Sequence, residues 1–392
     1  MPPIYREPAG GTCKTLFFIS SLDGGGAERV MVDLVRHIDR GRIEPGLVLL
    51  YPYEESPYKN DLPDDLRIIV VERKSDHVFH KLKQFLAFLK TVFRENPQVI
   101  LSMLTHNNIM AFLAGKFFGI EVIVCEHNTL GEVIKTREGR TMLGLPVAPM
   151  VKIFYRFVKR VIAVSDGIRL NLIEDFGIPA EKVRTIYNPI DLDRIQASSS
   201  RRPGHPFFED QKPVVMAMGR LVEQKGFDTL INAFRHVVRE IDARLIIMGE
   251  GQQRRMLENM VEKYGIAGKV SLPGFQRNPY ALLSHSDVFV LSSNYEGLPM
   301  AIFEAMACGV PVIATDCRSG PREILRNGTC GMLVPVGDEI ALAQGIKRLL
   351  KGDEMRKKLS ASGKERLKDF SFEKIMKQYE DVIDEARGHR RC

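Results

Sequence analysis

The sequence lacks the features that mark secreted and membrane-spanning proteins. Its six cysteines show neither C-x-x-C spacing nor the density of a small disulfide-bonded scaffold, which favours a reducing cytosol. No uninterrupted apolar run approaches the roughly 20 residues that a membrane-spanning helix needs. The N-terminus also lacks the pattern of a signal peptide. Any action at a membrane is therefore expected to take place from its cytoplasmic surface.

Motifs for nucleic-acid binding are also missing. We find no zinc-ligand pairs, no aromatic RNA-binding signature and no basic zipper, although the net charge is +7 at pH 7. The segment from Lys135 to Arg160 holds seven basic residues and one acid, Glu138. Its basic residues are Lys135, Arg137, Arg140, Lys152, Arg156, Lys159 and Arg160. The cluster predicts contact with a diphospho-lipid or an anionic membrane surface rather than with nucleic acid.

A repeated pattern of apolar runs and helical periodicity is present in both halves of the 392-residue chain. A chain of this length suits two domains rather than one core. Each run reads as a buried parallel strand, and several end in glycine or polar residues. The strands are expected at 15–20, 46–51, 67–71, 99–103, 122–125 and 161–164, and then at 214–218, 245–248, 270–272, 288–291 and 312–315. The sequence therefore predicts an α/β protein with two Rossmann-like domains.

The segment 79–94 has the periodicity of an amphipathic helix. An apolar stripe is expected to pack against the first sheet, with membrane insertion as the alternative. The stripe consists of Leu82, Phe85, Leu86, Leu89 and Phe93, and Lys83, Lys90 and Arg94 lie opposite.

The segment 286–315 organises the second half of the chain. A buried strand is expected to open into a loop, and Gly297 and Pro299 precede a helix from Met300 whose first turn offers free N–H groups to an anion. Glu296 lies in the loop and Glu304 about two turns along the helix. Carboxylates accept hydrogen bonds from vicinal hydroxyls, so the pair could hold a sugar and a ribose. Alternatively, Glu296 caps the helix and Glu304 lies on a solvated face.

Three further loops carry candidate residues. Arg220 and Lys225 stand between a predicted strand and helix, where two cations suit a diphosphate, although solvated surface residues would look the same. Gly24 to Gly26 follow the first strand but do not form a dinucleotide fingerprint. Asp191 and Asp193 could resemble a metal-binding pair, but we interpret them as part of a linker, with a hinge at 197–204.

Three motifs resemble those of the retaining glycosyltransferases of family four. They are N-Y-E-G-L-P-M-A-I-F-E-A-M-A-C-G-V-P-V-I-A-T at 294–315, G-G-A-E-R at 25–29 and G-R-L-V-E-Q-K-G at 219–226, and the resemblance spans about residues 16–379. It implies the GT-B fold, with two Rossmann-like domains facing across a cleft and a C-terminal helix that crosses back. The acceptor domain is then expected at 1–195 with 370–392, and the nucleotide-sugar domain at 196–369.

The resemblance also implies roles for individual residues. His127, which could otherwise be a surface loop histidine, touches the donor hexose. Catalysis is assigned to His127, Arg220, Lys225 and Glu296. Donor binding is assigned to Gly25, Gly26, Arg220, Lys225, Gly249, Gly274, Phe275, Glu296, Gly297, Leu298 and Glu304, and acceptor binding to Gly24, Glu28 and Asn107. No metal ion and no other cofactor is expected.

The implied reaction moves a hexose or N-acetylhexosamine from a nucleotide sugar, UDP-linked by expectation, with retention of configuration. The acceptor is expected to be a lipid-linked or lipopolysaccharide-type glycan, such as one on polyprenyl diphosphate, at the inner face of the cell membrane. One alternative is a synthase with a soluble acceptor, of the sucrose or glycogen type. Another is a non-catalytic subunit that binds sugar nucleotides.

Overall fold

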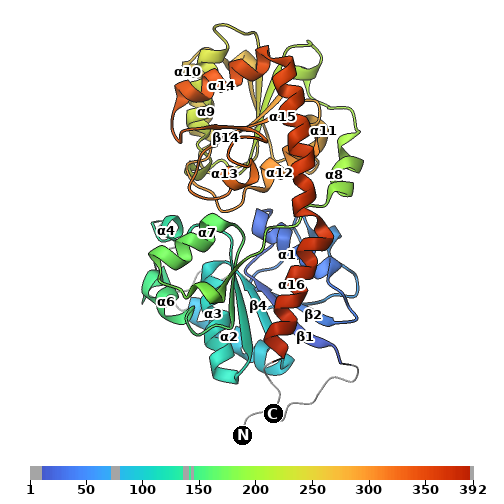
Figure 1. Cartoon of the computed structure of the whole chain (residues 1–392), viewed down its shortest axis with the longest axis vertical. Coiled ribbons are helices and arrows are strands. Elements are labelled where there is room, and N and C mark those ends of the chain that lie inside the picture. The colour runs from blue at the N-terminus through green and yellow to red at the C-terminus, as the bar shows by residue number, and fades with distance from the viewer. Residues whose placement is uncertain (1–10, 72–79, 136–140, 143–144, 389–392) are drawn as a thin grey trace. The chain divides into compact units, whose positions relative to one another are not determined.

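The protein consists of two compact units. The computed structural model describes residues 11–71, 80–135, 141–142 and 145–388 (Figure 1). Unit 1 comprises Met1–Pro189 and Phe372–Cys392, and unit 2 comprises Ile190–Ser371. The domain ranges predicted from the sequence differ from these by a few residues at each boundary.

Unit 1 is built on a seven-stranded sheet in the order β3-β2-β1-β4-β5-β8-β9, with every neighbouring pair parallel. Strand β4 is buried at every residue, and β1, β2, β5 and β8 at all but one, which explains their continuous apolar runs. The strands are β1 (Cys13–Ile19), β2 (Ile43–Leu49), β3 (Arg67–Val70), β4 (Val99–Met103), β5 (Glu121–Glu126), β8 (Arg160–Ala163) and β9 (Val183–Thr185). A short hairpin pairs β6 (Thr141–Met142) with β7 (Leu145–Pro146).

Helices cover both faces of this sheet. Helices α1 (Gly26–His37) and α16 (Phe372–Arg387) share one core with Phe17 of β1. Because side chains alternate along a strand, the next residue, Phe18, points to the opposite face and stacks on Phe88 with ring centroids 4.1 Å apart. That face carries α2 (His80–Glu95) and α3 (Thr105–Phe118). Shorter helices follow at α4 (Leu130–Val133), α6 (Val147–Phe154) and α7 (Asp166–Leu170).

The predicted helix at 79–94 forms as α2, but the prediction of its packing face is wrong. Residue 79 lies outside the described residues. The side chains that the helix buries include Phe88 and Val92, together with the polar Gln84, Thr91 and Glu95. The predicted stripe instead lies largely exposed, with Leu82, Leu86 and Phe93 each about half accessible to solvent. The helix has apolar residues on two sides, and packing chooses the side with Phe88.

Unit 2 repeats the architecture with a parallel six-stranded sheet in the order β12-β11-β10-β13-β14-β15. The strands are β10 (Val214–Met218), β11 (Arg244–Met248), β12 (Val270–Gly274), β13 (Val288–Leu291), β14 (Val312–Thr315) and β15 (Met332–Val334). The helices are α8 (Leu192–Ser199), α9 (Phe227–Val237), α10 (Arg254–Lys263), α11 (Tyr280–Leu283), α12 (Met300–Ala307), α13 (Pro321–Ile324), α14 (Glu339–Lys351) and α15 (Asp353–Arg366). The predicted Rossmann-like pattern is therefore present in both units.

The predicted linker at Asp191 and Asp193 is wrong in its conformation. Asp191 caps helix α8, and its carboxylate accepts a hydrogen bond from the N–H of Arg194 at 2.9 Å. The predicted hinge at 197–204 therefore begins inside this helix and lies within unit 2. An aspartate before a helix satisfies one of the free N–H groups of its first turn. In the described part of the chain, no group of three acidic, histidine or cysteine side chains is placed to hold a metal ion.

Candidate active site

In unit 2 the candidate site lies where the strand order reverses. Strands β10 and β13 are neighbours in the middle of the sheet, and the chain leaves them in opposite directions. Ligands of open α/β sheets bind outside the carboxyl ends of such a strand pair. The two segments that follow these strands are 219–226 and 292–299, and they hold Arg220, Lys225 and Glu296.

Hydrogen bonds fix the two segments against each other. The backbone N–H of Asn294 donates to the carbonyl of Gln224 at 2.8 Å, and the side chain of Gln224 donates to the carbonyl of Tyr295 at 3.1 Å. The hydroxyl of Ser292 donates to the carbonyl of Lys225 at 2.9 Å. The strand ends therefore form a rigid frame that positions the charged side chains.

The close approach of these segments depends on Gly226. It has a φ of 57°, in the left-handed region, and a Cβ placed on it would lie 2.3 Å from the carbonyl oxygen of Ser292. Gly226→Ala is therefore expected to lower the free energy of unfolding by about 1–3 kcal/mol more than Gly265→Ala does. Gly265 is the matched control because its φ is 67° and no atom lies within 4 Å of its added Cβ. Urea unfolding of both variants measures the difference, and equal losses would contradict the prediction.

Lys225 and Glu296 meet at the centre of the frame. The Nζ of Lys225 lies 2.5 Å from Oε1 of Glu296, and the hydroxyl of Ser293 donates to the same oxygen at 2.6 Å. Glu296 is 5% exposed. Burial removes hydration from the carboxylate, and the ammonium group and the hydroxyl replace part of it with hydrogen bonds. Glu296 does not cap helix α12, whose N-cap is Pro299.

The other predicted donor residues surround this pair. Arg220 is exposed, and no described residue forms an ion pair with it. Glu304 lies on α12 and accepts a hydrogen bond from the hydroxyl of Tyr280 at 2.9 Å. Gly297 and the buried Leu298 lie in the segment that leads into α12.

Two further strand ends complete this edge of the sheet. A Cβ on Gly249, which follows β11, would lie 1.9 Å from the carbonyl oxygen of Gly219. Only glycine fits this approach between two strand ends. Gly274 ends β12 with a φ of 82°, and the adjacent Phe275 is exposed, so its ring is free to stack on a base.

Unit 1 has its own reversal point, between β1 and β4. The hydroxyl of Ser20, after β1, donates to the amide oxygen of Asn107, at the start of α3, at 2.6 Å. Between β4 and α3, Leu104 has a φ of 75°, a conformation that side chains rarely adopt and that often marks functional sites. The predicted acceptor residues therefore lie at this edge, Gly24 in the loop after β1, and Glu28 and Asn107 in the first turns of α1 and α3. The predicted donor residues Gly25 and Gly26 lie at the start of α1.

The arginine of the G-G-A-E-R motif has a structural role. Arg29 is buried, forms ion pairs with Asp33 and Asp61, each at 2.5 Å, and lies over the ring of Tyr58. The hydroxyl of Tyr58 donates to the carbonyl of Gly25 at 3.3 Å. The motif thus supports the glycine loop through a buried ion-pair network.

A buried polar network lies at the end of β5 and was given no role from the sequence. Glu126 accepts hydrogen bonds from Thr105 at 2.9 Å, from Asn108 at 3.0 Å and from the hydroxyl of Tyr155. Burial raises the pKa of Glu126 to about 7, although these three donors oppose the increase. The only signal in the sequence was its position beside His127.

His127 is 7% exposed and is therefore not a surface loop histidine. Its burial lowers its pKa to about 4, so the ring is neutral at pH 7. Its Nε2 has no hydrogen-bond partner among the described residues. A buried ring nitrogen of this kind can receive or offer one hydrogen bond to a ligand.

The raised pKa of Glu126 predicts a pH dependence of stability. A carboxyl whose folded pKa exceeds its unfolded value of 4.5 binds more protons in the folded state, so its contribution to stability falls as pH rises from about 4.5 to about 7. Glu126→Gln should remove this contribution. When the pH is raised from 5 to 8, the free energy of unfolding measured with urea should fall less, or rise more, for the variant than for the wild type. His127 contributes the opposite slope in both proteins and cancels in the comparison, so identical pH dependence would contradict the prediction.

Two family models match the chain, one for each half. "Glycosyltransferase Family 4" matches residues 24–194, and "Glycosyl transferases group 1" matches residues 201–366. The chain belongs to glycosyltransferase family 4. A 4-alpha-N-acetylgalactosaminyltransferase of Campylobacter jejuni, acting on N-acetylgalactosamine-N,N'-diacetylbacillosaminyl-diphospho-undecaprenol, is 27% identical over 91% of this chain and 96% of its own. The lipopolysaccharide core biosynthesis glycosyltransferase LpsE of Rhizobium meliloti is 34% identical over 59% of this chain and 65% of its own.

Two solved structures share the fold of this chain. Anabaena HepE, in complex with UDP-glucose, superimposes with a TM-score of 0.79 and 19% identity over 95% of this chain and all of its own. A glycosyltransferase of Rickettsia africae gives a TM-score of 0.77 and 18% identity, over 96% of this chain and 99% of its own. The predicted GT-B class, with two parallel-sheet α/β domains, is confirmed.

Proposed function

We propose that this glycosyltransferase moves a hexose or N-acetylhexosamine from a UDP-sugar to a lipid-linked or lipopolysaccharide-type glycan. The observation that carries the proposal is the grouping of Arg220, Lys225 and Glu296 at the reversal point of the unit 2 sheet. Cations at such a site suit a diphosphate, and a buried carboxylate suits sugar hydroxyls. The Campylobacter and Rhizobium relatives support the acceptor class.

In the proposed reaction the bond between the anomeric carbon and the diphosphate breaks, and a bond to the acceptor oxygen forms. Arg220, Lys225 and the free N–H groups at the start of α12 stabilise the negative charge on the departing diphosphate. The leaving phosphate oxygen takes the proton of the acceptor hydroxyl, so the products are UDP and the extended glycan. We assign retention of configuration to this front-face route, and we propose that the cations make a metal ion unnecessary.

Glu296 and Lys225 act as a pair in this scheme. When the donor binds, the diphosphate competes for Lys225, and the sugar hydroxyls compensate the carboxylate by donating hydrogen bonds to it. Glu304 binds the ribose, and Phe275 lies against the base. We assign the acceptor to Gly24 and to Glu28 and Asn107 in the first turns of α1 and α3. The contact of His127 with the donor hexose stays a prediction.

We further propose that the enzyme works on the cytoplasmic side, at the inner face of the cell membrane. In the described parts of the chain no helix is long and apolar enough to cross a bilayer. Of the predicted basic cluster, Arg137 and Arg140 lie outside the described residues, and Lys135 and Arg160 form ion pairs with Glu132 at 2.7 Å and Glu385 at 2.9 Å. The membrane contact therefore needs more than this cluster.

Incubation with a panel of UDP- and GDP-sugars, with and without EDTA, tests the function. We expect slow hydrolysis of a UDP-sugar that accelerates when a lipid-linked glycan is added and that EDTA does not abolish. Binding of a sugar nucleotide without hydrolysis or transfer would favour the non-catalytic subunit. Faster turnover with a soluble sugar acceptor would favour the sucrose or glycogen synthase type.

A further inference from the structure

One side of unit 1 exposes an unusual number of large apolar side chains. They lie on α2, α3 and the segment that includes α6. Their exposed fractions are 46% for Leu82, 55% for Leu86, 57% for Phe93, 75% for Phe117, 54% for Ile153 and 60% for Phe157. Single exposed apolar residues are normal, but a group of this size marks an interaction surface.

Contacts between aromatic rings connect these helices. The ring of Phe93 on α2 lies 5.9 Å from that of Phe118 on α3, and Phe117 packs edge-on against Phe118 at 4.8 Å. Phe112 of α3 stacks on Phe154 of α6 at 4.7 Å. The exposed residues therefore belong to one layer of packed helices, on the side of the sheet opposite α16.

The same layer is rich in cations and poor in acids. In α2, α3 and residues 147–160, the described basic side chains are Lys83, Lys90, Arg94, Lys116, Lys152, Arg156, Lys159 and Arg160. Glu95 is the one acid among the described side chains of these segments, and it is buried in ion pairs with Arg67 at 2.8 Å, Arg94 at 3.3 Å and Lys14 at 3.6 Å. We call the exposed apolar and basic residues of α2, α3 and 147–157 the apolar-basic face; Lys159 and Arg160 are only partly exposed and are not counted in it.

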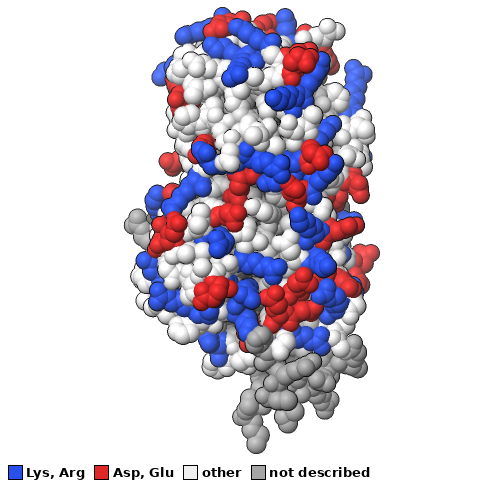
Figure 2. All heavy atoms as spheres, viewed as in Figure 1, with Lys and Arg blue, Asp and Glu red and all other residues white. Residues whose placement is uncertain are grey.

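The side of unit 1 that carries α16 has a different charge pattern. Figure 2 shows basic and acidic side chains interspersed there. Glu380 of α16 pairs with Arg42 at 3.0 Å, and Glu385 pairs with Arg160 at 2.9 Å and Arg184 at 3.3 Å. Acids thus neutralise cations on the α16 side, whereas most cations of the apolar-basic face have no acid beside them in the same segments.

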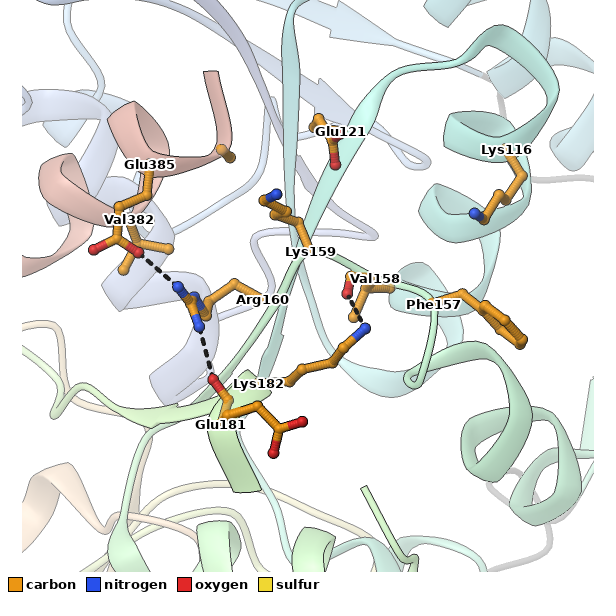
Figure 3. A pocket seen from close by; sticks show the side chains of 11 residues that line it. Lys116, Glu121, Phe157, Val158, Lys159, Arg160, Glu181, Lys182, Val382 and Glu385 are labelled. Carbon is orange, nitrogen blue, oxygen red and sulfur yellow. Dashed lines mark hydrogen bonds and ion pairs between the residues drawn. The ribbon is translucent and has the colours of Figure 1, made fainter. Parts of the chain in front are cut away.

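A pocket of about 540 Å³ borders the face (Figure 3). Phe157, Lys116 and Lys159 belong to its lining, and the Nζ of Lys116 lies 5.7 Å from the ring centre of Phe157. Glu121 and Glu181 also line it. The pocket lies at the amino ends of β5, β8 and β9, so it is separate from the candidate site at the carboxyl ends.

We propose that the apolar-basic face docks on an anionic lipid bilayer, with its phenylalanines and leucines in the interfacial region and its lysines on lipid phosphates. This inference rests on the proposed lipid-linked acceptor and names the partner surface of the enzyme. Apolar residues combined with lysine and arginine are typical of surfaces that lie in the membrane interface. A second copy of the chain fits less well, because a two-fold contact would bring two cation-rich faces together.

A single tryptophan tests the docking, because the sequence contains none. Phe93→Trp places a reporter on the face, and Ile340→Trp places one at an exposed site of unit 2. With vesicles of phosphatidylcholine and phosphatidylglycerol, we expect a blue shift of emission for Phe93→Trp, quenching by brominated lipid, and neither effect for Ile340→Trp. Equal responses of the two variants, or none, would overturn the proposal.

Vesicle sedimentation separates this inference from the proposed function. The variant Leu86→Ser/Phe93→Ser/Phe117→Ser should bind anionic vesicles roughly tenfold or more weakly, because each removed side chain loses apolar burial in the interface. The control Met256→Ser/Ile340→Ser should bind like the wild type. Donor hydrolysis without membranes should be the same in all three proteins. Unchanged vesicle binding of the triple variant would overturn the docking, and so would a wild-type dimer that is lost in the triple variant while vesicle binding stays the same. Absence of hydrolysis in the wild type would instead overturn the proposed function.

Discussion

Lys225→Ala is expected to lower the turnover of the UDP-sugar roughly 10²–10³-fold, which is the usual loss when one preorganised donor to a developing negative charge is removed. The side chain is partly buried and lies at the centre of the frame, 2.5 Å from Glu296. Its removal takes a cation from the departing diphosphate and leaves Glu296 buried without its ion-pair partner. Steady-state transfer assays at saturating donor measure the effect.

The matched control is Lys212→Ala. Lys212 belongs to the same unit and forms an exposed ion pair with Asp242 at 3.1 Å. Exposed pairs of this kind contribute little, so its removal should leave turnover within about twofold. Turnover of Lys225→Ala within a few-fold of the wild type would show that the leaving group does not depend on this cation.

Glu296→Gln is expected to lower transfer roughly 10²-fold while the affinity for UDP stays nearly unchanged. Glutamine keeps the shape of the side chain but loses the charge that holds the sugar hydroxyls and Lys225. UDP lacks the transferred hexose, which is the part of the donor assigned to this residue. Transfer kinetics and calorimetry with UDP measure the two quantities separately.

Ser293→Ala serves as the comparison for Glu296→Gln. The hydroxyl of Ser293 donates to Glu296 at 2.6 Å, so its loss should lower transfer by about tenfold or less through the position of the carboxylate. If Glu296→Gln lowered the affinity for UDP as strongly as it slowed transfer, the assignment of this carboxylate to the transferred hexose would be wrong.

Much of the fold could be predicted from the sequence because parallel buried strands are continuous apolar runs. The run at 288–291 gave β13 with these bounds, and the run at 312–315 gave β14. Helix α2 shows the limit of this reasoning. Its apolar residues lie on two sides, and periodicity alone cannot tell whether Phe88 or Leu86 meets the sheet. Only the packing of Phe88 on Phe18, from a strand 70 residues away in sequence, decides it.

The residues of the candidate site were predicted, but their contacts were not. Lys225 and Glu296 are 71 residues apart in sequence, and their ion pair depends on the neighbouring positions of β10 and β13. The sequence predicted no role for Glu126, because its local sequence does not show whether the side chain lies in a polar loop or is buried against Tyr155. Burial of a carboxyl is a property of the packed sheet.

The central claim is that the diphosphate of the donor binds at the reversal point of the unit 2 sheet. The most direct measurement is the affinity of the wild type and of Arg220→Ala for UDP and for uridine, by calorimetry. We expect Arg220→Ala to lower the affinity for UDP roughly tenfold or more, because a charged hydrogen bond to phosphate is lost. The affinity for uridine should stay unchanged. Equal affinity of both proteins for UDP would contradict it.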